Sequence, residues 1–137
     1  MPAFDQCHDQ VARAIQKEGW QIEDEPFRLL VPPRVGFVDL RVSRGQNGHF
    51  EQLMLIEVKC FPDEDSTTRD LYVSIGQDLV YRAMIAELDL PEVLYLAVPQ
   101  PIFETIFDQS VMWVINESKI RLVIVNLETE TIVQWIR

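Results

Sequence analysis

The sequence predicts a mixed α/β domain whose central sheet, with both parallel and antiparallel strands, is flanked by helices. Its 137 residues, 47% of them apolar and 25% charged, suit one compact domain over residues 1–137. Apolar residues recur at helical spacing in three segments, and they alternate or run together in six shorter segments. A helical segment between two buried strands favours parallel neighbours in the sheet. Together these observations predict helices packed on a mixed sheet.

The first helix is expected from Pro2 to Gly19, because Phe4, Val11 and Ile15 recur at helical spacing and Gly19 suits a helix end. Strands are expected over residues 20–30 and 34–43, separated by two prolines. A turn over residues 44–50 joins the second strand to a third, over residues 51–61. The second and third strands therefore form a hairpin.

The second half begins with a long helix over residues 67–87, for which Ser66 or Thr67 is the expected N-cap. A buried strand over 92–98 and a mostly helical segment over 101–118 follow. Two strands around a turn at 126–130 end the chain. The predicted order is αβββαβ, then a helix and two strands.

The stretch LMLIEVKC places two charges in an apolar strand. Glu57 and Lys59 are two residues apart and point to one face, while Val58 points to the other. Asp39 lies in the preceding apolar run, and the hairpin can bring it beside Glu57. Two adjacent carboxylates repel unless a cation lies between them, and hard oxygen ligands suit magnesium. Because the chain has few Cys and His residues, most other metals fit less well.

Lys59 has a chemical role beside such a metal, because an ammonium can position water or stabilise charge that develops on a phosphate. The reaction that follows is phosphodiester hydrolysis. A partly buried salt bridge at the end of a sheet is the alternative explanation. A second Glu-x-Lys triplet, Glu117 to Lys119, lies at an expected helix end in polar surroundings, and we interpret it as surface.

The net charge of −10 argues against a protein that coats nucleic acid unaided. A local basic segment nevertheless surrounds the hairpin, and Arg34, Arg41 and Arg44 are its candidate phosphate-binding residues. Cys7 and Cys60 lie far apart without a CxxC motif, so free thiols are expected. The sequence shows no signal peptide and no membrane helix, which makes the cytoplasm the default location.

An Asp on one strand and a Glu-x-Lys on the next, between two helices, resembles the PD-(D/E)XK nuclease superfamily. This resemblance implies a restriction-endonuclease-like core and a nuclease in which Asp39, Glu57 and the Val58 carbonyl hold magnesium, or alternatively manganese. Gln77 and Tyr81 are four residues apart and resemble the Gln-xxx-Tyr element of RecB-like nucleases. The alternative is the polar edge of an amphipathic helix.

A narrower resemblance covers nearly the whole chain. The opening MPAFDQCHDQV, KEGW, the central VDL and IEVKCF, then IGQDLVYR, LYLAVP and the ending IVQWIR are similar to the XisH family of fdxN element excision controlling factors. The resemblance implies a role in programmed DNA excision together with a companion, XisI. His8 matches the family's first helix, although a partly buried structural histidine is the alternative.

Two functions from different classes follow. The first is a magnesium-dependent nuclease-like enzyme that acts on DNA. The second is a non-catalytic accessory protein on the same fold, which works through an XisI-like partner in site-specific recombination. The acidic charge favours the second, because such a chain needs a partner or a focused basic face to approach DNA. A homo-oligomer is also compatible with the apolar terminal strand.

Overall fold

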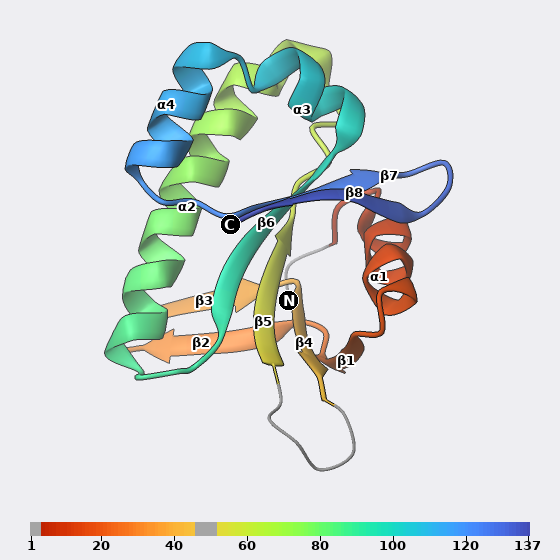
Figure 1. The fold of residues 1–137 in the computed structure, drawn as a ribbon. Coiled ribbons are helices and arrows are strands. Elements are labelled where there is room, and N and C mark those ends of the chain that lie inside the picture. Colours follow the sequence, from red (N-terminus) through yellow and green to blue (C-terminus); the bar gives the residue numbers. More distant parts are fainter. Residues whose placement is uncertain (1–3, 46–51) are drawn as a thin grey trace.

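The computed structural model describes residues 4–45 and 52–137 and shows helices on both sides of a mixed sheet (Figure 1). The large sheet has the strand order β1-β4-β5-β6-β7-β8, and β2 pairs with β3 in a separate small sheet. The elements are α1 (His8–Lys17), β1 (Gln21–Asp24), β2 (Phe27–Val31), β3 (Arg34–Val38), β4 (Leu40–Arg44), β5 (Gln52–Val58), the 3₁₀ turn η1 (Glu64–Ser66), α2 (Thr67–Glu87), β6 (Val93–Pro99), α3 (Gln100–Ile106), α4 (Gln109–Glu117), β7 (Leu122–Asn126) and β8 (Thr131–Ile136).

The predicted mixed sheet is confirmed. β5 and β6 are parallel, as are β6 and β7, whereas the other neighbours in the large sheet are antiparallel. The helices α2 and α3–α4 form the crossovers between the parallel strands. The predicted hairpin is the β4–β5 pair, in which Leu40 lies opposite Ile56. Pro2 and most of the turn expected at 44–50 lie outside the described residues.

The strands expected over 20–30 and 34–43 were wrong as continuous elements. Each is divided, so that β1 pairs with β4 in the large sheet while β2 pairs with β3 in the small one. The two predicted strands still pair with each other, but the pair bends from the large sheet (β1–β4) into the small sheet (β2–β3). Pro26 lies at the break in the first strand and has no N–H to donate to a ladder. Asp39 lies at the corresponding bend, between β3 and β4 rather than inside a strand.

The segment expected to be one helix over 101–118 is divided as well, into α3 and α4. Asp108 lies between them, and its carboxylate accepts a hydrogen bond from the backbone N–H of Val111 at 3.0 Å. A side chain of this kind caps the first turn of a new helix. The helix predicted over 67–87 is α2, with the same bounds.

Alternation along the strands divides the apolar core. Ile56 and Val58 of β5 point toward α1, whereas Leu55 points toward α2 and the small sheet. The α3–α4 side has a third cluster, which includes Leu96 and Leu122. Figure 1 shows α1 on one side of the sheet and α2 on the other. Within the described ranges, none of the helices is both long and apolar enough to span a membrane.

Candidate functional site

A pocket of ≈ 250 Å³ lies at the C-terminal end of β5, between the large sheet, the small sheet and α2. Six of the residues selected from the sequence line it together: Asp39, Glu57, Val58, Lys59, Gln77 and Tyr81. They come from the β3–β4 bend, from β5 and its extension, and from the inward face of α2. The fold thus converts a pattern spread over 43 positions of the chain into one small polar cavity.

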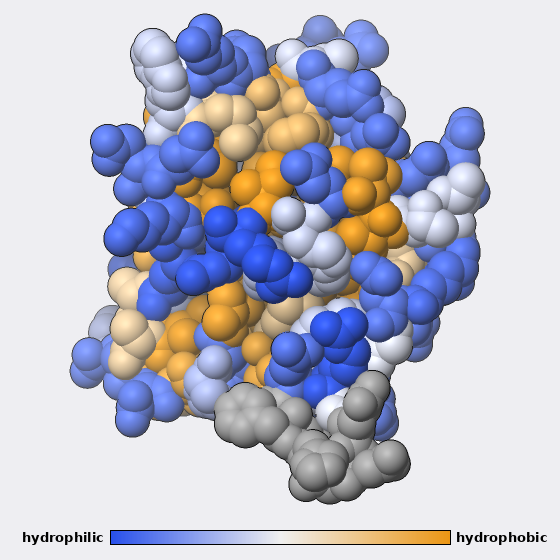
Figure 2. Space-filling model, viewed as in Figure 1, coloured by the Kyte–Doolittle hydropathy of each residue, from blue (hydrophilic) through white to orange (hydrophobic). Residues whose placement is uncertain are grey.

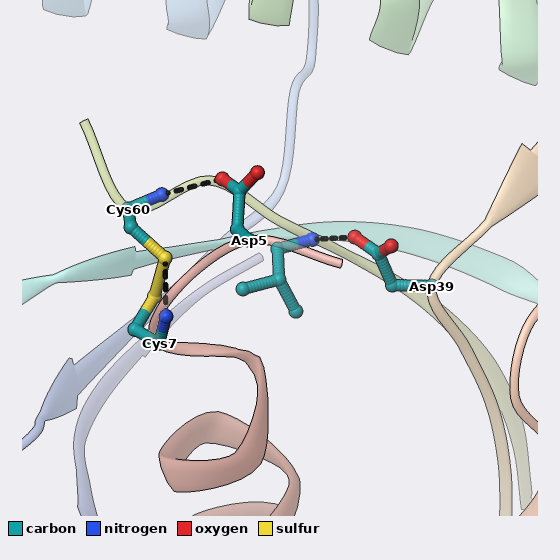
Figure 3. The surroundings of a disulfide bond; sticks show 5 residues. Asp5, Cys7, Asp39 and Cys60 are labelled. Atoms are coloured by element: carbon teal, nitrogen blue, oxygen red, sulfur yellow. Dashed lines mark hydrogen bonds between the residues drawn. A yellow bond between two sulfur atoms is a disulfide. The ribbon is translucent and has the colours of Figure 1, made fainter. Parts of the chain in front are cut away.

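Each of the two carboxylates accepts a hydrogen bond from a backbone N–H of the other's segment. Glu57 accepts a hydrogen bond from the N–H of Asp39 at 3.2 Å. Asp39 accepts one from the N–H of Val58 at 2.7 Å, and Figure 3 shows this second bond. The bend at Asp39 makes this exchange possible, because it releases the Asp39 N–H from the strand ladders. The side chains of Asp39 and Glu57 are therefore held next to each other.

Glu57 is 8% exposed and is the most buried acid in the pocket. Burial, and then the charge of Asp39, raises the pKa of Glu57 to about 9, although the Lys59 ammonium opposes this shift. At neutral pH the carboxyl of Glu57 consequently retains a proton. A cation placed between the two carboxylates would displace that proton, because it would replace repulsion with attraction.

Oxygen donors of the kind that magnesium prefers line this side of the pocket. Val58 donates its N–H to Asp39, and the C=O of a strand residue points to the same side as its N–H, so the Val58 carbonyl faces the carboxylate pair. Over residues 4–45 and 52–137, no group of three or more His, Cys, Asp or Glu side chains is placed to hold a metal. Magnesium retains several waters and needs only one or two protein carboxylates, in contrast to a structural zinc ion.

Lys59 follows β5 directly and keeps the strand's direction, because its N–H donates to the carbonyl of Ala97 at 3.0 Å. Its Nζ lies 4.0 Å from Oε2 of Glu57, and its side chain is 23% exposed. The ammonium therefore lies at the mouth of the pocket beside the carboxylates. The expectation that Glu57 and Lys59 share one face is confirmed.

Gln77 and Tyr81 form the α2 wall of the pocket. The Gln77 amide donates to the Tyr81 hydroxyl at 3.0 Å, and that hydroxyl donates to the carbonyl of Phe37 at 3.2 Å. Gly36 permits this arrangement, since a Cβ there would lie 2.7 Å from the Tyr81 ring. Oε1 of Gln77 is buried and has no hydrogen-bond partner among the described residues. It remains available to a group that enters the pocket.

The structure adds Asp5, which the sequence did not single out for this site. Asp5 lines the pocket, and its Oδ2 accepts a hydrogen bond from the Cys60 N–H at 3.0 Å (Figure 3). In the sequence Asp5 resembles any acid near a helix start. Asp5 and Cys60 are 55 positions apart in the sequence, and only the packing of α1 against the sheet brings them together.

The prediction of free thiols was wrong. Cys7 and Cys60 form a disulfide with their Cα atoms 5.8 Å apart, which joins the start of α1 to the residue after Lys59. The spacing rule failed because it concerns neighbours along the chain, whereas these cysteines meet through the contact between α1 and the end of β5. The disulfide holds Asp5 and Lys59 on segments that are covalently linked.

Four of the predicted residues do not line this pocket. His8 is 2% exposed, and its Nε2 lies 2.6 Å from Glu25, as a structural histidine would be placed. Arg41 is paired with Asp24 and Glu92, each at 3.1 Å. Arg34 begins β3 and is exposed, one residue before the pocket wall. The phosphate-binding roles of the three arginines and the supporting role of His8 stay predictions.

Arg44 belongs to a different pocket, of ≈ 500 Å³, at the opposite end of the parallel strands. Its guanidinium lies 4.5 Å from the centre of the Trp20 ring. This pocket is also lined by Met54, Val93 and Tyr95. In Figure 2 hydrophobic residues form several patches on the viewed face, and strongly hydrophilic residues lie between them. Arg44 thus packs over an apolar surface far along the strands from Asp39.

The fold and the pocket define a mixed α+β domain with paired carboxylates and a lysine at the end of its central strand. Residues 1–133 match the family described as XisH protein, and the chain therefore belongs to the XisH family. No protein with a curated description matches the chain.

Two solved structures are similar to this chain over almost its whole length. The crystal structure of an XisH family protein from Nostoc punctiforme PCC 73102 has a TM-score of 0.87 and 29% identity, and the match covers 97% of this chain and 100% of the other. That of a fdxN element excision controlling factor protein from Anabaena variabilis has a TM-score of 0.84 and 30% identity, with coverages of 95% and 97%.

Proposed function

We propose that this XisH family protein is a magnesium-dependent, PD-(D/E)XK-type nuclease that takes part in programmed excision of a DNA element. The observation that carries the proposal is the convergence of Asp39, Glu57 and Lys59 on one pocket, with the two carboxylates side by side. A partly buried salt bridge at the end of the sheet needs no second carboxylate. A buried glutamic acid with a raised pKa beside a second acid is typical of functional sites.

In this proposal the side chains of Asp39 and Glu57, with the Val58 carbonyl, hold the ion. Bound magnesium, or manganese, supplies positive charge against the phosphoryl oxygens. Lys59 orients the attacking water and stabilises the charge that builds on the phosphate. Gln77 positions substrate or water through its free amide oxygen, and Tyr81 holds Gln77 in place. The reaction is the hydrolysis of a phosphodiester bond.

DNA reaches this site with help from a partner. The net charge is −10, and Arg41, one of the arginines near the hairpin, is already paired with acids of the same chain. Phosphate binding depends on cations that are not already paired, so Arg41 adds little to it while it binds Asp24 and Glu92. We propose an XisI-like protein as this partner and the cytoplasm as the compartment. Both follow from the family resemblance and the composition.

The paired state of Arg41 also favours a second candidate function. In it the chain is a non-catalytic accessory protein on the same fold, which works through its XisI-like partner in site-specific recombination. The carboxylate pair would then be structural. This function requires that partner binding survive Glu57→Ala and that the purified chain bind no divalent metal.

A cleavage assay with magnesium, DNA and the partner protein decides between the two. We expect metal-dependent cutting by the wild type and a loss of about 10²-fold or more in Glu57→Ala and in Lys59→Ala. The matched controls are Glu117→Ala and Lys119→Ala, at the exposed triplet, and they should cut at the wild-type rate. Undiminished cutting by both site variants would exclude the assignment.

A further inference from the structure

The outward face of α2 carries apolar residues where a surface helix normally carries charges. Tyr72, Val73, Leu79 and Val80 are 68%, 50%, 43% and 44% exposed. Gly76, Ala83 and Ala86 are exposed between and beyond them. No charged residue interrupts this set, although it covers about four turns of helix. We call these seven residues the outer stripe of α2.

The opposite face of α2 is already used. Leu71, Ser74, Asp78, Tyr81 and Ile85 are buried against the sheets. A helix that is apolar on all sides is normally buried on all sides. In Figure 1 α2 runs along the outside of the molecule, and the exposed fractions of its side chains show that the described residues leave its second apolar face largely uncovered. Such a sequence is typical of a helix that is packed on both faces.

The outer stripe has the spacing of a helix–helix seam. Tyr72, Gly76, Leu79, Ala83 and Ala86 follow one another at steps of four and three residues, which is the heptad pattern. Large and small side chains alternate along its first four positions. In an antiparallel pair of two identical stripes, Leu79 faces Gly76 and Tyr72 faces Ala83. Apart from the neighbouring residues and backbone of α2 itself, no atom of the described residues lies within 4 Å of a Cβ position at Gly76, so the space outside the helix is open.

Charged residues at the two ends of the stripe also complement each other in an antiparallel pair. Arg69 lies in the first turn of α2 and Glu87 is its last residue, and both are exposed. Each has the sign that the helix dipole disfavours at its position, because N-termini favour anions and C-termini favour cations. Neither forms an ion pair with another residue of the described ranges.

An antiparallel second helix reverses this disadvantage. In the register that places Leu79 opposite Gly76, Arg69 lies beside Glu87 of the second helix and near that helix's C-terminus. Glu87 lies beside Arg69 and near the other N-terminus. We propose that the outer stripe of α2 binds the same stripe of a second copy of this chain, which forms a two-fold symmetric antiparallel dimer. This interface is independent of the proposed nuclease function.

Sedimentation of the full chain tests the proposal. We expect the wild type to have twice the 16.0 kDa mass of one chain, and Leu79→Glu or Val80→Glu to be monomeric with an unchanged circular dichroism spectrum. Val133→Glu, a matched change at a residue of β8 that is 47% exposed, should remain a dimer. A monomeric wild type, or a dimer that persists in both α2 variants, would overturn the proposal.

A charge exchange tests the antiparallel arrangement. Arg69→Glu and Glu87→Arg each place a charge where the helix dipole favours it, so neither should weaken the isolated helix. Each alone should nevertheless raise the dimer's dissociation constant several-fold, and the double variant should restore it. If the single variants bind as tightly as the wild type, or the double variant stays dissociated, the two stripes do not pair in this way.

Discussion

The chain contains the triplet Glu-x-Lys twice, and the two copies have opposite surroundings. Glu57 is 8% exposed and lies in a pocket with a second carboxylate. Glu117 is exposed at the end of α4, and Lys119 follows it in a left-handed backbone conformation, with φ of 56°. The same Glu-x-Lys spacing thus occurs in a polar pocket in one place and at a helix end in the other. The difference shows that the strand, the bend at Asp39 and the packing of α2 create the site.

The first triplet is followed by a covalent link, and the second is not, which gives a prediction about stability. Reduction of the Cys7–Cys60 disulfide should lower the free energy of unfolding by about 2–4 kcal/mol, because it frees a loop of 53 positions in the unfolded chain. Urea unfolding with and without a dithiol measures this. The variant with both cysteines changed to Ala should be insensitive to the dithiol, and two free thiols in the unreduced, denatured wild type would contradict the link.

The two glutamates should differ in their effect on stability as pH changes. The folded state raises the pKa of Glu57 from 4.5 to about 9, so between these values the folded chain binds a proton that the unfolded chain has released. Without metal, the free energy of unfolding should therefore fall as pH rises through this window, by at most about 1.4 kcal/mol per unit.

The substitutions that separate the two glutamates are Glu57→Gln and Glu117→Gln. Glu57→Gln should flatten the pH dependence of unfolding, because the amide mimics the protonated acid and does not titrate. Glu117→Gln should leave the dependence unchanged, since that side chain is exposed. Equal slopes in the wild type and Glu57→Gln would show that Glu57 titrates normally.

Two tyrosines of α2 provide the smallest expected effect. Tyr81→Phe removes a hydroxyl that joins Gln77 to the carbonyl of Phe37, which should cost about 1 kcal/mol of unfolding free energy. Tyr72→Phe removes a hydroxyl from a side chain that is 68% exposed and should cost almost nothing. If both changes have the same effect in chemical denaturation, the α2 wall does not hold the pocket as described.

Patterns local in the chain were predicted correctly. The sequence was sufficient for α2, for the β4–β5 hairpin and for the shared face of Glu57 and Lys59, because each depends on periodicity within a short segment. The predicted hairpin also placed Asp39 beside Glu57. The second triplet, Glu117 to Lys119, was correctly interpreted as surface from its polar neighbours.

Features that depend on distant packing were missed. The break at Asp39 looked like continuous strand because its neighbours Val38 and Leu40 are both apolar. Cys7 meets Cys60, and Arg41 meets Glu92, across 53 and 51 positions. No local rule tests such pairs. Asp5 entered the pocket by the same route, through the packing of α1 at the end of β5.

Calorimetric titration with magnesium tests the central claim most directly. The wild type should bind the ion with an affinity that rises with pH below about 9, because binding displaces the proton held by Glu57. Glu57→Gln should lose most of that binding, and Glu117→Gln should keep all of it. Magnesium binding by Glu57→Gln equal to that of the wild type, or no binding by the wild type at any pH, would contradict the account.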